Sequence, residues 1–98
     1  NTIKSYNTDI LLISCKGLSL EGGLFDSDEN EADIKQLMAK KAAKIILLAD
    51  HTKFDNVAFA KLMDLEAIDV LVTDRRPSEA WIDALAASGV QLLYPEAE

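Results

Sequence analysis

Four polar side chains at residues 50–53 follow a predicted buried strand. Residues 45–49 form a short apolar run that is bounded by polar residues and too short for a helix, which predicts a strand covered on both faces. Asp50, His51, Thr52 and Lys53 then offer a carboxylate, an imidazole, a hydroxyl and an ammonium. In a parallel α/β sheet the loops after the carboxyl ends of the strands form the ligand crevice. These residues therefore indicate either a binding site or an ordinary solvated loop.

Cations outside the helix ends also follow the predicted strands. Lys16 follows the first strand, His51 and Lys53 follow the second, and Arg75 and Arg76 follow the third. In a parallel sheet these loops share one edge, which predicts a positive rim suited to a small anion such as a phosphate ester. The alternative is that loops at strand ends are solvated and carry charge anyway.

Catalytic and metal motifs are absent from the sequence. It holds one His and one Cys, and neither HExxH, CxxC nor GxSxG occurs. Cys15 is interpreted as a small core residue. Asp50 and Asp74 both end strands, as in a phosphate-accepting receiver domain, but that fold needs paired acids after its first strand, where this chain has Ser14, Cys15 and Lys16. No catalytic residue, metal or cofactor is predicted.

Length, charge and cysteine content narrow the class of protein. A chain of 98 residues makes one domain. Its net charge of −7 argues against direct binding of nucleic acid. The single cysteine fits a reducing compartment. No apolar run approaches the ~20 residues that span a bilayer, and no signal peptide is visible, so we expect a cytoplasmic protein. Because the chain begins at Asn1, it is interpreted as a piece of a longer protein.

Strands and helices alternate along the predicted chain. Strands are expected at residues 9–15, 44–50, 69–73 and 90–94, and helices after Asp28 and from Pro77 to about residue 88. Residues 55–63 fit either a short helix or a strand. This order predicts an α/β fold, an open three-layer sandwich with a mostly parallel sheet and right-handed crossovers.

Capping residues and apolar spacing define the two helices. Asp28 and Glu31 form a capping-box pattern at the start of the first helix, and Gly89 is placed to end the second. Pro77 suits the first helical position. The residues expected to face the core share one side of each helix: Ile34, Leu37, Met38 and Ala42 in the first, and Trp81, Ile82, Leu85 and Ala86 or Ser88 in the second.

Residues 16–30 are expected to form a loop whose first half contains three glycines, Gly17, Gly22 and Gly23. The glycines permit positive φ and a close approach of ligand to backbone, as in a phosphate-binding loop. However, the loop matches neither phosphate-binding motif, GxGxxG or GxxxxGK[ST]. A turn that merely needs flexibility is an equally good explanation.

With these residues in view, the chain resembles the C-terminal effector-sensing domain of DeoR-type bacterial transcription repressors. The matching segments are TDILLISCKGLSLEGG at 8–23, NEADIKQLM at 30–38, LLADHTKF at 47–54 and IDVLVTD at 68–74. The resemblance implies a fold like that of ribose-5-phosphate isomerases and CoA transferases. It also implies sensing of a phosphorylated sugar or related metabolite, with DNA bound by a separate N-terminal helix-turn-helix domain that this chain lacks.

The resemblance also implies an effector-binding set. Lys53 is expected to contact the anionic ligand directly, and Lys16 replaces an acid found in many members, which adds a cation. The complete expected set is Asp9, Lys16, Gly17, Gly23, Glu31, Asp50 and Lys53.

Two other functions stay open beside this one. A sugar-phosphate isomerase or transferase needs carboxylates for proton abstraction, where the strand-one loop offers Lys16. The other alternative is an oligomerisation module with a vestigial site. The family's domain starts before Asn1, so exposed sheet or apolar surface is expected to favour self-association.

Overall fold

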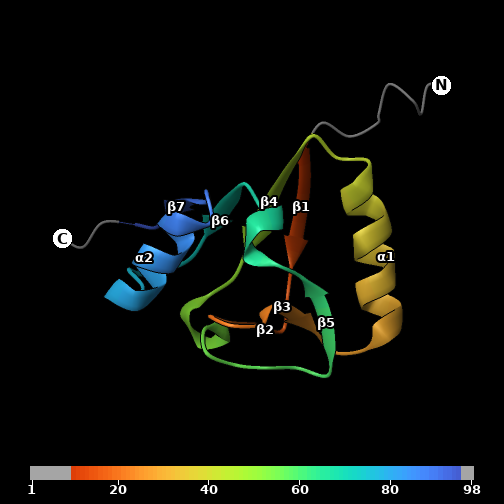
Figure 1. The fold of residues 1–98 in the computed structure, drawn as a ribbon, viewed down its shortest axis with the longest axis horizontal. Helices are drawn as coiled ribbons and strands as arrows, with labels where there is room; N and C mark the ends of the chain where they lie inside the picture. The colour runs from red at the N-terminus through yellow and green to blue at the C-terminus, as the bar shows by residue number, and fades with distance from the viewer. Residues whose placement is uncertain (1–9, 96–98) are drawn as a thin grey trace.

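A four-stranded parallel sheet forms the centre of the fold (Figure 1). The computed structural model describes residues 10–95 of the chain. Strand order is β1-β4-β6-β7, and each neighbouring pair is parallel. The strands are β1 (Ile10–Ser14), β4 (Lys44–Leu48), β6 (Val70–Val72) and β7 (Gln91–Leu93). The predicted strands and the α/β class with a mostly parallel sheet are confirmed.

A second, antiparallel sheet corrects the predicted loop at residues 16–30. Its strands are β2 (Gly17–Ser19), β3 (Gly23–Asp26) and β5 (Ala60–Met63), in the order β2-β3-β5. The loop prediction was wrong because the glycine-containing turn joins two short strands as a hairpin. The ambiguity at residues 55–63 is resolved in favour of a strand, which occupies only the last four of these residues.

Two helices and two short 3-10 turns connect the strands. Helix α1 (Glu29–Lys40) begins at Asp28, whose carboxylate accepts a hydrogen bond from the backbone nitrogen of Glu31 at 2.8 Å, as the capping pattern predicts. The 3-10 turns are η2 (His51–Lys53) and η3 (Leu65–Ala67). Of the helices within residues 10–95, none combines the length and apolarity needed to cross a membrane.

Helix α2 (Glu79–Ala87) starts two residues later than predicted. Ser78 is its N-cap, so Pro77 precedes the helix instead of occupying its first turn. Trp81 and Leu85 are buried as expected, whereas Ala86 is exposed. Gly89 follows the helix with φ of +77°, the left-handed conformation expected at its end.

The predicted buried side of α1 was wrong for three of its four residues, since only Ala42 packs against the core, just after the end of the helix. Helix α1 packs through Ala32, Lys35 and Gln36, and the Gln36 side chain donates to the backbone oxygen of Leu62 in β5 at 2.7 Å. Each residue of an α-helix is rotated by about 100° from the one before it, so residues two positions apart lie on nearly opposite sides. The apolar residues of the stripe come two positions after these three residues and therefore face outward. The exposed stripe consists of Ile34, Leu37 and Met38, which are 57%, 60% and 43% exposed.

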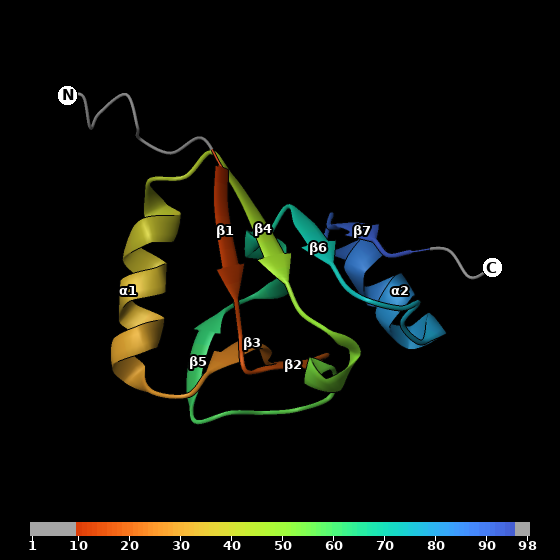
Figure 2. The ribbon, with the colours of Figure 1, turned by 180° about the vertical axis from the view of Figure 1, so that it is seen from behind.

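The main sheet has one face in the core and one that is largely uncovered. The core face packs against α2 and the small sheet, and includes Ile13, Leu47 and Leu71, which lie side by side in the parallel register. Leu12 and Leu48 on the opposite face are 60% and 45% exposed. Within the described residues, Figure 2 shows no helix over this face of β1 and β4. The expectation that β4 is covered on both faces is therefore wrong for this part of the chain.

Two glycines with positive φ provide a matched test of packing in the small sheet. Gly23 has φ of +87°, and a Cβ there would lie 2.5 Å from the backbone oxygen of Met63, whereas a Cβ at Gly89 would meet nothing within 4 Å. We predict that Gly89→Ala lowers the free energy of unfolding by about 1–2 kcal/mol, the cost of a left-handed L-residue. Gly23→Ala is predicted to cost at least about 1 kcal/mol more because it adds a steric clash. Urea unfolding measures both, and equal losses would contradict the close β3–β5 approach.

Candidate functional site

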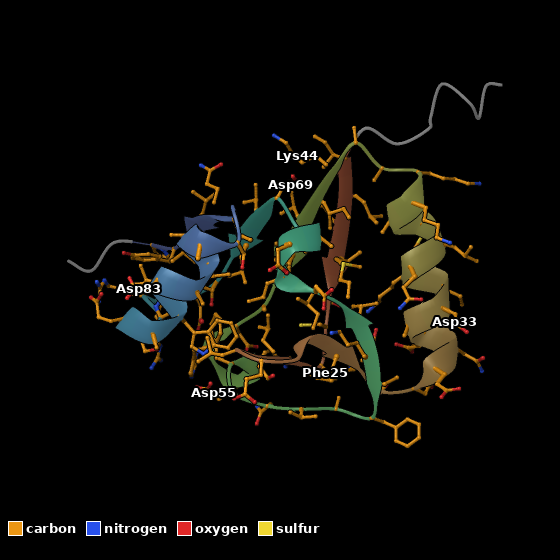
Figure 3. The ribbon with its side chains drawn as sticks, in the orientation of Figure 1. Phe25, Asp33, Lys44, Asp55, Asp69 and Asp83 are labelled. Atoms are coloured by element: carbon orange, nitrogen blue, oxygen red, sulfur yellow. The ribbon has the colours of Figure 1, made fainter. Side chains whose placement is uncertain are left out.

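The carboxyl ends of β4 and β6 meet at one edge of the sheet, as predicted. Asp74, just after β6, accepts hydrogen bonds from the backbone nitrogen of His51 at 2.7 Å and pairs with His51 Nδ1 at 2.8 Å. The hydrogen bond from the His51 side chain is the largest cause that holds the pKa of Asp74 below its usual value. Figure 3 shows Lys44 and Asp69 at the opposite end of the sheet from Asp55, which follows η2.

The η2 turn presents Lys53 beside this edge. Asp50 is the N-cap of the turn, and its carboxylate accepts hydrogen bonds from the side chain and backbone nitrogen of Thr52. These bonds, with the Lys53 charge, hold the pKa of Asp50 below its ordinary value. Lys53 Nζ lies 3.9 Å from the Asp50 carboxylate and is partly exposed. Such a long ion pair holds the ammonium weakly, so Lys53 is available to a ligand.

A buried ion pair lies under the loop that follows β1. Asp26 is fully buried at the end of β3, with Oδ2 2.7 Å from Lys35 Nζ, and the same ammonium donates to the backbone oxygen of Ser14 at 2.7 Å. Burial raises the pKa of Asp26, but the Lys35 ammonium and the Ser27 amide outweigh that effect and lower the pKa below its ordinary value. The nearby charge of Lys16 acts in the same direction.

Sequence reasoning missed this pair because its members are nine residues apart in different elements. The signal for it was a polar residue on the alanine side of the helix, since Lys35 shares that side with Ala32 and Ala39. In α1 this lysine lies where the helix approaches the buried Asp26 carboxylate. An apolar stripe on another side of the same helix was the stronger pattern and led to the wrong orientation.

Cys15 is a core residue, as its apolar context suggested. It is 3% exposed, and burial raises the pKa of its thiol to about 11, although the charges of Lys35 and Lys53 act in the opposite direction. At neutral pH the thiol is therefore protonated and a poor nucleophile.

The structure divides the predicted cationic rim into two groups. Lys16 follows the end of β1, and Lys53 is on the η2 turn that follows β4. Arg75 and Arg76 lie with His51 around a separate cavity at the start of α2. The predicted shared edge is present, but the cations do not converge on a single point.

The remaining predicted site residues occupy different settings. Glu31 is exposed in the first turn of α1. Gly17 is buried against the backbone of Asn56, where a Cβ would lie 2.8 Å from its carbonyl carbon, and Gly23 packs against β5. Close packing of the chain is thus sufficient to require both glycines. Asp9 lies outside the described residues.

The arrangement suits anion binding by side-chain ammonium groups. The Lys35 ammonium pairs with the buried Asp26 carboxylate, and the charge of Lys16 adds a second positive charge near it, which leaves a local excess of positive charge on an acidic protein. Within residues 10–95, no group of three or more His, Cys, Asp or Glu side chains is placed to hold a metal ion.

We predict that Asp26→Asn lowers the free energy of unfolding by about 3 kcal/mol, because it leaves the largely buried Lys35 ammonium without its charge partner. The wild-type pair stabilises the fold above the unfolded pKa of about 3.9, and this contribution is lost as pH falls through the lower folded pKa. The Asn variant should lack this component of the acid dependence. Urea unfolding across pH measures it. Asp33→Asn, at an exposed position of α1, is the control, and a matching loss there would contradict the assignment.

Comparisons with known proteins identify the family. The family model of the DeoR C terminal sensor domain matches residues 1–75. The chain is 38% identical over 94 residues to the HTH-type transcriptional repressor GlcR of Bacillus subtilis, covering 96% of this chain and 36% of that protein. It is 32% identical over 96 residues to the regulator GolR of Listeria innocua, covering 98% and 38%. It is also 34% identical over 74 residues to the L-fucose operon activator of Escherichia coli, covering 76% and 30%.

The chain therefore spans about a third of the length of these curated relatives, which are transcriptional regulators. This chain belongs to the DeoR C terminal sensor domain family.

Proposed function

We propose that this chain is the effector-binding part of a DeoR-type transcriptional regulator, and that a phosphorylated sugar or related metabolite binds at the carboxyl edge of its parallel sheet. The observation that carries the proposal is the presence of two ammonium groups, Lys35 and Lys16, near Asp26, the one buried carboxylate among residues 10–95. The relatives support it, since one is a repressor and another activates an L-fucose operon. In this proposal the chain is a single domain that forms the C-terminal part of the sensor, and the regulator acts in the cytoplasm.

The proposed contacts follow from the charges of the site. The Lys53 ammonium binds the anionic group of the effector, and Lys16 adds a second positive charge. Asp50 caps the η2 turn that carries Lys53, and Glu31 at the start of α1 accepts hydroxyl hydrogen bonds from a sugar. Asp9, Gly17 and Gly23 complete the proposed set, the glycines through their backbone amides.

We propose a binding role and not a catalytic one. Asp26 is fully buried and already paired with Lys35, so it is poorly placed to remove a proton from a substrate. Lys16 follows Cys15 where proton abstraction would need a carboxylate. Interconversion of aldose and ketose phosphates by the purified protein would contradict this assignment.

The proposed mechanism is linkage between effector binding and DNA binding. An effector that binds one arrangement of the regulator more tightly shifts the population toward that arrangement, with a coupling free energy of about 1–3 kcal/mol. DNA is contacted by a helix-turn-helix region and not by this acidic chain, whose net charge is −7.

We predict that Lys53→Ala weakens binding of a phosphorylated sugar by about tenfold or more, because a charge-assisted contact is lost. Calorimetry with a panel of sugar phosphates measures this. Lys61→Ala is the matched control, since Lys61 lies on β5 and pairs with Asp64. Equal affinities for wild type and Lys53→Ala would remove Lys53 from its proposed role. Binding of no phosphorylated metabolite would favour an oligomerisation module with a vestigial site.

We also propose that the chain self-associates through the uncovered face of its parallel sheet. This face includes Ile10, Leu12, Leu48 and Leu93, which are 45–60% exposed. Parallel sheets are normally covered on both faces. From strand spacing and rise, four short strands present at most about 300 Å². A stable interface buries about 800 Å² per partner, so the association through this face should be weak.

We predict that Leu12→Lys shifts this association toward monomer, because it places a charge in the middle of the apolar face. Sedimentation velocity over a range of protein concentrations measures the effect. Leu20→Lys is the control, since Leu20 is 43% exposed in the turn between β2 and β3. A wild-type chain that stays monomeric at high concentration would refute the proposed interface.

A further inference from the structure

The exposed apolar residues of helix α1 face away from the rest of the described chain. Ile34, Leu37 and Met38 are 57%, 60% and 43% exposed. At about 100° per residue, Asn30 and Lys41 extend the line of Ile34 and Leu37 toward the two ends of the helix, and both are exposed. Figures 1 and 2 show α1 at one side of the molecule, and no other described element covers its outward side. We call these five residues the outer face of α1.

The charges of α1 are separated along its length. Its first half carries the acids Glu29, Glu31 and Asp33, and its end carries Lys40 and Lys41. Among residues 10–95, none of these five side chains belongs to an ion pair. Asp33 and Lys40 are separated by about 10 Å along the helix axis, at a rise of about 1.5 Å per residue. The two halves of one helix are therefore too far apart to neutralise each other.

The spacing of these residues is complementary to itself. The midpoint between Ile34 and Leu37 falls between residues 35 and 36, and it is also the midpoint between Glu31 and Lys40. When two copies of α1 pack in opposite directions about this point, Ile34 of each copy meets Leu37 of the other. The acidic half of each helix then lies beside the lysines of the other, and the helix dipoles are antiparallel. Parallel packing would instead place acids beside acids and lysines beside lysines.

We propose that the outer face of α1 binds the same face of a second copy of this chain, with the two helices antiparallel about a two-fold axis. A helix of 12 residues is about 18 Å long and about 10 Å across, so it covers roughly 200 Å² of each copy. A stable interface buries roughly 800 Å² per partner, so this contact alone is weak and forms at high protein concentration. It is separate from the uncovered face of the parallel sheet and does not require the Lys53 contact.

Cysteine crosslinking tests the direction of packing. Cys15 is the only cysteine of the chain and is 3% exposed, so a cysteine introduced on the outer face is the accessible thiol. The variants Asn30→Cys and Lys41→Cys, one of them carrying a mass tag, are mixed and treated with a short bis-maleimide. We expect crosslinks between positions 30 and 41 to exceed those between two positions 30 by at least about fivefold, since antiparallel packing separates the latter by about 16 Å along the axis. Leu20→Cys, at a position 43% exposed in the turn between β2 and β3, is the control for random collision.

A charge-swap series tests the pairing of acids with lysines across the interface. Asp33→Lys and Lys40→Asp each replace attraction with repulsion at two symmetric places, so each should weaken dimerisation by at least about fivefold at low salt. The double variant Asp33→Lys/Lys40→Asp again places opposite charges across the interface and should recover the wild-type dissociation constant to within about twofold. The concentration dependence of the backbone amide shifts of α1 measures this constant. Lys61→Ala, which removes a positive charge from β5, should leave it unchanged.

Further outcomes separate this contact from the other surfaces of the chain. Both experiments are repeated with Leu12→Lys, and unchanged results show that the α1 contact is independent of the sheet face. Loss of the α1 crosslink in Leu12→Lys would assign the association to the sheet face and overturn the proposal. Crosslinking no greater than that of Leu20→Cys would leave the outer face to a different partner and also overturn it. So would equal crosslinking of the two pairings, or a double charge variant that stays as weak as the single ones. Far-UV circular dichroism confirms that each variant keeps its helices.

Discussion

The Lys35 ammonium is the contact on which the arrangement of the two sheets depends. It joins helix α1 to Asp26 at the end of β3, and it also donates to Ser14 at the end of β1. One side chain thus links the helix, the antiparallel sheet and the parallel sheet. An ammonium largely removed from water is costly unless paired, so the ionised Asp26 carboxylate stabilises this geometry. The Lys35 contact also explains why α1 turns its alanines inward and its larger apolar residues outward.

The main sheet was predictable from the sequence because its strands are local apolar runs. The apolar composition of residues 44–48 and 70–72 predicts strands. Parallel pairing follows because the strands alternate with helices along the chain. The hairpin of β2 and β3 was not predictable in the same way, since three or four residues with glycines carry too little periodicity. The prediction of the orientation of α1 was wrong for a different reason. A buried ion pair outweighed the apolar stripe that the periodicity of the sequence indicated.

The candidate site shows the same division between local and non-local information. The location of Asp50 and Lys53 at the sheet edge was predictable because they follow a recognisable strand, with Asp50 as the N-cap of the η2 turn and Lys53 at its end. The pairs His51–Asp74 and Asp55–Trp81 bring together residues 23 and 26 positions apart. Their formation depends on the order of strands and on the placement of α2. The spacing of residues within a single helix or strand cannot predict such pairs.

Strand β4 connects the polar edge to the uncovered apolar face. Alternate residues of this strand point to opposite sides, so Leu47 packs in the core while Leu48 is exposed on the other face. Directly beyond them, the chain continues into Asp50 and the turn that carries Lys53. A ligand that repositions this turn also moves the end of β4. One face of this strand packs in the core, and the other face is exposed. In the proposed regulator, this continuity gives a short physical route from a bound anion to a surface that associates with another chain, and linkage requires only that the two arrangements differ in affinity for the anion.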